Sequence, residues 1–164
     1  MKKVFLSLFA ALAMFFMVSC GAAEGVQDGE TAAKEYAEAF QSGDPQSILN
    51  AYNSIATKYG AKYQSAGTVA LAGYIGGLST KLDETDPKIN GTYFGIMLAN
   101  AKIQNLDVES IQKAVDNAKE QSKDKAAFQA GVDLAASWYA APAQEEQPAE
   151  AEGEGEGEGE EEAE

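Results

Sequence analysis

The sequence predicts an all-α protein, a single small bundle of five to six helices followed by a disordered acidic tail. Apolar residues recur at spacings of three and four through residues 30–140, and no alternating, strand-like run persists there. Asp44-Pro45 and Asp86-Pro87 are typical helix starts, because aspartate caps a helix and proline suits its first position. About 120 residues are enough for one domain with one core.

The chain begins like that of an exported protein. Met1-Lys2-Lys3 is basic, and residues 4–18 are apolar apart from one serine, which is typical of a secretory signal peptide. A transmembrane anchor is the alternative, but about 15 apolar residues fall short of the roughly 20 that span a bilayer. We therefore expect residues 1–19 to be a signal peptide that is removed.

Cys20 is the one cysteine of the chain, so it has no disulfide partner. The segment Met17-Val-Ser-Cys20, followed by Gly21, resembles the lipobox of bacterial lipoproteins, with methionine where leucine is commonest. The resemblance implies diacylglycerol on the Cys20 sulfur, cleavage before Cys20 and a further acyl group, such as palmitate, on the new amino terminus. An ordinary secretory signal followed by a chance cysteine is the alternative. Two or more acyl chains hold a protein on a membrane effectively permanently.

The predicted anchor also indicates a location. The signal and the tail resemble those of lipoproteins of Bacteroidota, and Gly21 in place of aspartate favours the outer membrane by analogy with enterobacterial sorting. Whether the domain faces the periplasm or the cell surface stays open. Residues 20–29, rich in glycine, alanine and acid, are expected to be the lipidated cysteine and a flexible spacer.

The helical domain is expected over residues 30–140. Its first helix ends at Ser42-Gly43, and the short hinge to Pro45 predicts an antiparallel hairpin with the second helix. The second helix is expected to bury one apolar face, made of Ile48, Leu49, Tyr52, Ile55, Ala56 and Tyr59.

The third helix is expected over residues 68–82, and the fourth from Pro87. Glycines four apart in each helix, Gly73 with Gly77 and Gly91 with Gly95, suggest that a neighbouring backbone comes close. The two small-residue faces are candidates to pack on each other. The fourth helix is apolar nearly all round, which predicts a central, buried position.

Aspartates mark the last two helix starts. Asp107 is expected to cap the fifth helix, and Ser122 or Asp124 the sixth.

Residues 141–164 carry eleven glutamates and no lysine, whereas residues 21–140 balance ten lysines against fifteen acids. Without apolar side chains this Glu/Gly-rich segment is expected to be a disordered tail. It would serve as a solvated spacer and repulsive brush, or as an electrostatic bait for cationic partners.

The sequence contains neither arginine nor histidine. Arginine is the usual residue for bidentate phosphate recognition, so we expect no nucleic-acid partner. Histidine is the commonest general base and metal ligand, so we expect no enzymatic activity, no metal site and no cofactor.

Three short motifs resemble functional sites, but each has a simpler structural role. Ser122-Lys-Asp-Lys125 matches the S-x-x-K string of serine acylases, but it lies where a helix needs a cap. Residues 73–81 are glycine-rich like a phosphate-binding loop, but the lysine is misplaced and helix packing is favoured. The acidic run Asp83, Glu84 and Asp86 lacks the spacing of a calcium loop, and a solvated interhelix loop is favoured.

The seven tyrosines and Trp138 fit core packing better than a sugar- or peptide-binding surface, although Tyr63 and Trp138 fit it least well. Residues 92–118 resemble the helical segment ahead of the catalytic domain in Mip-class FKBP-type prolyl isomerases. That resemblance rests on Tyr93, Gly95, Leu106-Asp107-Val108, Ile111, Ala114 and Ala118. It implies a dimerisation or substrate-cradling module without isomerase activity.

These observations predict a non-enzymatic cell-envelope lipoprotein, attached to the membrane by acyl groups on Cys20. Its helical module would act in binding, scaffolding or surface presentation. The alternative is a periplasmic chaperone-like or assembly accessory protein that binds unfolded or cationic clients. A protein partner is possible on either interpretation, and the oligomeric state stays open.

Overall fold

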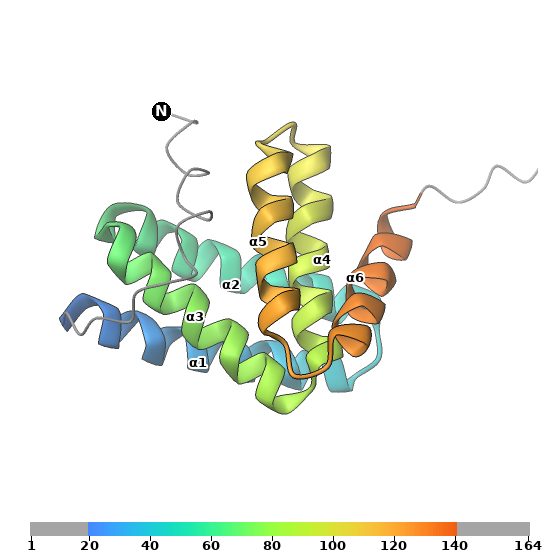
Figure 1. Ribbon diagram of the computed structural model, residues 1–164, viewed down its shortest axis with the longest axis horizontal. Helices are drawn as coiled ribbons and strands as arrows, with labels where there is room; N and C mark the ends of the chain where they lie inside the picture. Colours follow the sequence, from blue (N-terminus) through green and yellow to red (C-terminus); the bar gives the residue numbers. More distant parts are fainter. Residues whose placement is uncertain (1–19, 141–164) are drawn as a thin grey trace, which may run out of the picture.

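The computed structural model describes residues 20–140, and over these residues it contains six α-helices and no strand. The all-α prediction is therefore confirmed. The predicted signal peptide and the predicted acidic tail both lie outside the described residues. Figure 1 shows α1 (Cys20–Gln41), α2 (Pro45–Ala66) and α3 (Thr68–Thr85) lying together, with α4 (Pro87–Ile103) and α5 (Val108–Gln121) standing across them. The sixth helix, α6 (Lys125–Tyr139), packs beside α4.

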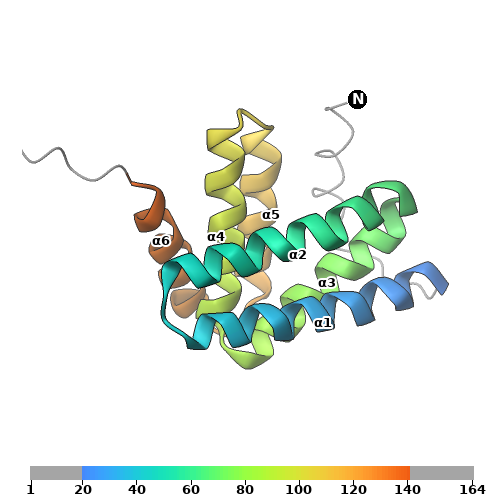
Figure 2. The ribbon, with the colours of Figure 1, turned by 180° about the vertical axis from the view of Figure 1, so that it is seen from behind.

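Aspartates begin four of the helices, as the sequence predicts. The carboxylates of Asp44, Asp86, Asp107 and Asp124 each accept a hydrogen bond from a backbone N–H in the first turn of α2, α4, α5 and α6. The sixth helix is thus capped by Asp124, and Ser122 precedes the cap. The α1–α2 hairpin is also present, with α1 and α2 antiparallel (Figure 2).

The prediction of a flexible spacer over residues 20–29 is wrong, because these residues form the first turns of α1. Gly25 and Gly29 are buried against α3, and a Cβ atom on Gly25 would lie 2.9 Å from the Tyr74 backbone nitrogen. Glycine is a poor helix former by itself, so the helix here depends on the neighbour that the missing side chains admit. The helical domain therefore begins about ten residues earlier than predicted.

The small-residue faces of α3 and α4 do not pack on each other, contrary to that suggestion. Gly73 and Gly77 lie against the backbone of Ala22 and Val26 in α1. The small face of α4 lies instead against α6, where Gly91 approaches Phe128, Gly95 approaches Val132 and Ala135, and Gly131 approaches Lys88 and Thr92. Each glycine pair thus packs against a small-residue face of another helix: α3 pairs with α1, and α4 pairs with α6. The two helices of each pair run parallel.

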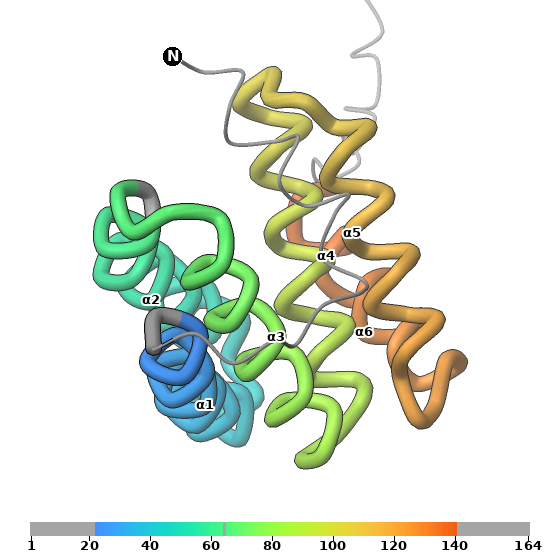
Figure 3. Tube along the Cα trace, turned by 60° about the vertical axis from the view of Figure 1, so that its left-hand side comes forward, coloured from blue at the N-terminus to red at the C-terminus, as the bar shows by residue number. Residues whose placement is uncertain are grey.

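The core consists of two clusters joined at α4. The larger cluster includes Tyr93 and Ile96 of α4 together with buried residues of α1, α2, α3 and α6. The smaller cluster includes Phe94 and Leu98 of α4 with residues of α5 and α6. Opposite faces of α4 contribute to the two clusters, which explains its nearly continuous apolar sequence. Figure 3 shows α4 between α3 on one side and α5 on the other.

The predicted buried face of α2 is mostly confirmed. Ile48, Tyr52, Ile55 and Tyr59 are buried and Leu49 is partly buried, but Ala56 is exposed.

Within residues 20–140, no helix combines the length and the apolar character needed to cross a membrane.

Candidate functional site

The predicted lipid site is the first of the residues that the structure describes. Cys20 is the first residue of α1, and the turns that follow it pack against the first turns of α3. Polar groups gather at this end of the molecule, where α1 begins and α2 ends.

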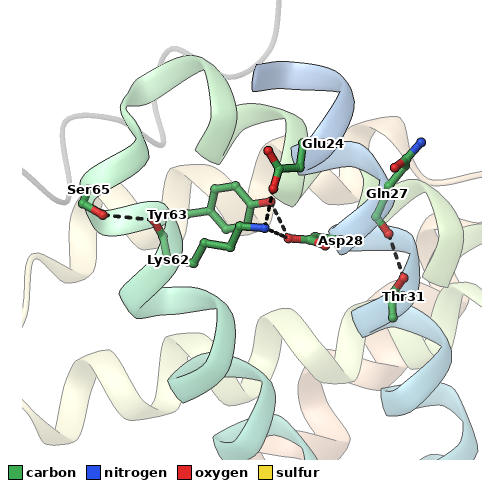
Figure 4. Close-up of polar contacts among 7 residues, drawn as sticks. All are labelled: Glu24, Gln27, Asp28, Thr31, Lys62, Tyr63 and Ser65. Carbon is green, nitrogen blue, oxygen red and sulfur yellow. Dashed lines mark hydrogen bonds and ion pairs between the residues drawn. The ribbon is translucent and has the colours of Figure 1, made fainter. Parts of the chain in front are cut away.

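Four side chains form a compact polar group there, which we call the Lys62 cluster: Glu24 and Asp28 of α1, and Lys62 and Tyr63 of α2. The Lys62 ammonium donates hydrogen bonds to Glu24 Oε1 at 2.7 Å and to Asp28 Oδ2 at 2.6 Å. The Tyr63 hydroxyl donates to the same Asp28 oxygen at 2.7 Å (Figure 4). The cluster thus fastens the start of α1 to the end of α2.

Three groups of the Lys62 cluster, Asp28, Lys62 and Tyr63, keep fixed protonation states around neutral pH. Burial tends to raise the pKa of Asp28, but the hydrogen bonds from Lys62 and Tyr63 outweigh it and hold the pKa below its ordinary value. Hydrogen bonds to Asp28 and Glu24 raise the pKa of Lys62. Burial and the bond to Asp28 raise the pKa of Tyr63 to about 12. None of these three groups is therefore suited to exchange a proton in a reaction near neutral pH.

A second ion pair joins the same two helices further along. Lys58 of α2 lies 3.0 Å from Glu35 of α1, and its ammonium also sits 4.7 Å from the centre of the Tyr59 ring. Both partners are substantially exposed, so the pair adds little to stability. Its contribution is to the pairing and register of the hairpin.

Replacing Lys62 should loosen the beginning of α1. In Lys62→Met, Glu24 and Asp28 lose their shared cation, and Asp28 keeps only its bond from Tyr63. We expect amide hydrogen exchange over residues 22–30 to become several-fold faster. Lys34→Met is the matched control, because Lys34 is an exposed α1 lysine outside the ion pairs seen within residues 20–140. Equal exchange in the two variants would contradict this role.

Another polar contact occupies the candidate S-x-x-K motif. The Ser122 hydroxyl donates to Asp83 Oδ1, and the Lys123 backbone N–H donates to Asp83 Oδ2 at 3.1 Å. Lys125, the motif's lysine, instead pairs with Glu120. The serine and lysine are thus each engaged with another residue, and Ser122 ties the α5–α6 connection to the end of α3.

The remaining motifs also have structural roles. Gly73 and Gly77 of the glycine-rich segment lie inside α3 against α1, which confirms helix packing. In the acidic run Asp83 binds Ser122, Glu84 pairs with Lys81 and Asp86 caps α4. Within residues 20–140, no three acidic or cysteine side chains gather closely enough to share a metal ion.

Most tyrosines belong to the core, as predicted. The rings of Tyr59 and Tyr63 both stack on Tyr74, with centroids 5.2 and 4.9 Å away, and Tyr36 and Tyr52 contact Tyr93. Tyr63 is buried, and Trp138 is partly buried against the larger core cluster. The buried hydroxyls of Tyr36 and Tyr74 have no hydrogen-bond partner among the described residues.

Few large apolar side chains are exposed in the part of the chain that the structure describes. They are Val69 at the start of α3, and Ile103 and Leu106 at the tip of the α4–α5 hairpin. Residues 92–118, which carry the resemblance to Mip-class proteins, form most of that hairpin. An extended apolar groove of the kind that cradles unfolded chains is not built from these three residues.

The Lys62 cluster was missed by sequence reasoning, although a signal exists. Glu24 and Asp28 are four residues apart, as are Lys58 and Lys62, so each pair lies on one helical face. The predicted hairpin would bring two such faces of opposite charge together, but Glu24 and Asp28 fall in the segment that was expected to be a flexible spacer.

Comparison with protein-family models, with curated proteins and with solved structures found no match for the chain.

Proposed function

We propose that this protein is a non-enzymatic cell-envelope lipoprotein. Acyl groups on Cys20 would hold its helical domain on the outer membrane, where the domain acts as a binding, scaffolding or surface-presented module. The observation that carries the proposal is the position of Cys20. The lipobox-like sequence ends at Cys20, and Ala22 and Gly25, only a few residues further on, already pack against α3.

The close junction has a mechanical consequence for this proposal. A flexible ten-residue spacer has an end-to-end distance of roughly 18 Å, so it would allow the domain to move by about that distance relative to its anchor. Here the first turns of α1 are instead fixed by the close contact with α3 and by the Lys62 cluster. The domain would therefore be presented in a restricted orientation, which suits a scaffold or a binding module of fixed geometry.

The chemistry of the described polar groups supports a non-enzymatic role. The charges of Asp28 and Lys62 are fixed near neutral pH, and the Ser122 hydroxyl is bound to Asp83. The chain has no histidine to serve as a general base. The few exposed large apolar residues give less support to the chaperone-like alternative than to a scaffold or binding module.

Metabolic labelling with palmitate tests the lipid anchor. We expect the unaltered protein to incorporate label, and Cys20→Ala to incorporate none and to leave the membrane fraction. Met17→Leu is the matched control, because it brings the sequence closer to the common lipobox and should keep full labelling. Continued labelling of Cys20→Ala, or no labelling of the unaltered protein, would overturn the proposal.

A further inference from the structure

One end of the domain is built from small, uncharged residues. We call it the uncharged end and define it as residues 20–23 of α1 together with residues 65–69, where α2 passes into α3. Because α1 and α3 run parallel, their first turns lie side by side: Gly73 approaches Ala22, and Gly25 approaches Ala70. Figure 2 shows the start of α1 and the α2–α3 connection at the same end of the molecule.

The composition of this end differs from that of the rest of the domain. No charged residue occurs in residues 20–23 or anywhere in residues 65–80, whereas residues 21–140 as a whole carry 25 charged side chains. Residues 65–69 are all exposed, and Val69 exposes 53% of its surface. The nearest charges are those of the Lys62 cluster, where Lys62 is bound to both carboxylates.

The chain outside the described residues indicates what this end faces. The apolar segment of residues 4–18 leads directly to Cys20, and so to the uncharged end. Before processing, that segment would lie in a membrane; after processing, the acyl groups on Cys20 would. In both states a lipid surface is the nearest large partner of this end.

We propose that the uncharged end rests on the bilayer, with the α2–α3 connection and Val69 in the lipid interface. This inference rests on the proposed lipidation of Cys20. The charge of the domain supports it: fifteen acids and ten lysines in residues 21–140 give a net charge of −5, which anionic headgroups repel. An uncharged surface of small residues bearing an exposed valine avoids that repulsion and can enter the interface.

Depth-dependent quenching tests the contact in the full-length lipidated protein. Acylation consumes the Cys20 thiol, so an introduced cysteine is the single labelling site. Val69→Cys carries an environment-sensitive fluorophore, and Thr68→Cys provides a second position on the same connection. Ser137→Cys is the control, because Ser137 is exposed on α6, at the opposite end of the molecule (Figure 1). The vesicles contain phosphatidylethanolamine, phosphatidylglycerol and a nitroxide-labelled lipid.

We expect the fluorophores at positions 68 and 69 to be quenched several-fold more strongly than the one at position 137. Equal quenching at the three positions, in protein shown to be acylated and vesicle-bound, would overturn the proposed orientation while leaving the lipid anchor intact. Shielding of positions 68 and 69 that appears only at high protein density would overturn it too, in favour of contact between copies. Failure of the proposed function is distinguishable, because the protein would then carry no acyl groups.

Discussion

Raising the pH above about 10 is expected to unfold the helical domain cooperatively. Burial raises the pKa of Tyr36, Tyr52, Tyr74 and Tyr93 above the ordinary value of about 10. In the unfolded chain these hydroxyls ionise near pH 10, whereas in the folded domain they stay protonated. The stability they contribute is therefore fully present below pH 10 and is lost as the pH rises through and beyond it.

The size of this effect is large compared with the stability of a small domain. Each buried tyrosine favours the unfolded state by about 1.4 kcal/mol for each pH unit above its unfolded pKa. Four such groups remove roughly 5 kcal/mol at about pH 11, against a typical total of about 5–15 kcal/mol. Hydrogen bonds to carboxylates raise the pKa of Lys58 and of Lys62, so both lysines lose their charge at higher pH than a free lysine, and their exposed ion pairs contribute little to stability.

Circular dichroism and tyrosinate absorbance, recorded in one alkaline titration, measure this transition. Helix loss and tyrosinate formation should coincide, with a midpoint well above pH 10. Tyr36→Phe is the informative variant, because it removes a buried hydroxyl that has no partner among the described residues. It should shift the midpoint to higher pH. Tyrosinate formation near pH 10 with the helices intact would show that these hydroxyls are open to water.

Gly91→Ala is expected to destabilise the domain by about 2 kcal/mol or more, although alanine is the better helix former. An added Cβ would overlap the Phe128 carbonyl group and lie 3.0 Å from the Phe128 Cα. These are backbone atoms of α6 and cannot move aside as a flexible side chain would. The change would force apart α4 and α6, which both contribute residues to the two core clusters.

Gly60→Ala is the matched control in α2. Nothing lies within 4 Å of a Cβ at this position, so the better helix propensity of alanine should stabilise the domain by up to about 1 kcal/mol. Urea unfolding measures the free energy of unfolding of both variants. Relative to the unaltered protein, it should fall in Gly91→Ala and rise in Gly60→Ala. A gain in stability for Gly91→Ala would contradict the close α4–α6 contact.

Features that depend on neighbouring residues could be predicted from the sequence. The caps at Asp44, Asp86 and Asp107 follow from contacts within four residues and are confirmed, and of the two candidates for the sixth helix, Ser122 and Asp124, the cap is Asp124. The central position of α4 follows from an apolar pattern that is too complete for a surface helix. Such signals are contained in a short window of sequence.

Features that depend on distant partners could not be predicted in the same way. Gly73 and Gly91 indicated close helix contacts correctly, but a small residue does not specify which helix comes close. Gly25 and Gly29 indicate a flexible segment when only their sequence neighbours are considered. The helix that contains them is stabilised by contact with α3, which lies far along the chain. The Lys62 cluster was missed for the same reason, and the lipid on Cys20 stays a prediction.

The pairing of α1 with α3 also sets an order of folding events. Residues in contact there are roughly 45 positions apart, as for Gly25 with Ala70. The contact between α1 and α3 closes a long loop that contains all of α2, so it can form only after α2 has been made. Because of its interior glycines, α1 is a marginal helix until α3 packs against it. On the proposed export and lipidation, the residues just after Cys20 would therefore stay extended and open to processing enzymes while the chain is made. They would join the core only when the chain has emerged to about residue 80, so the proposed maturation at Cys20 and the completion of the fold would be separated in time.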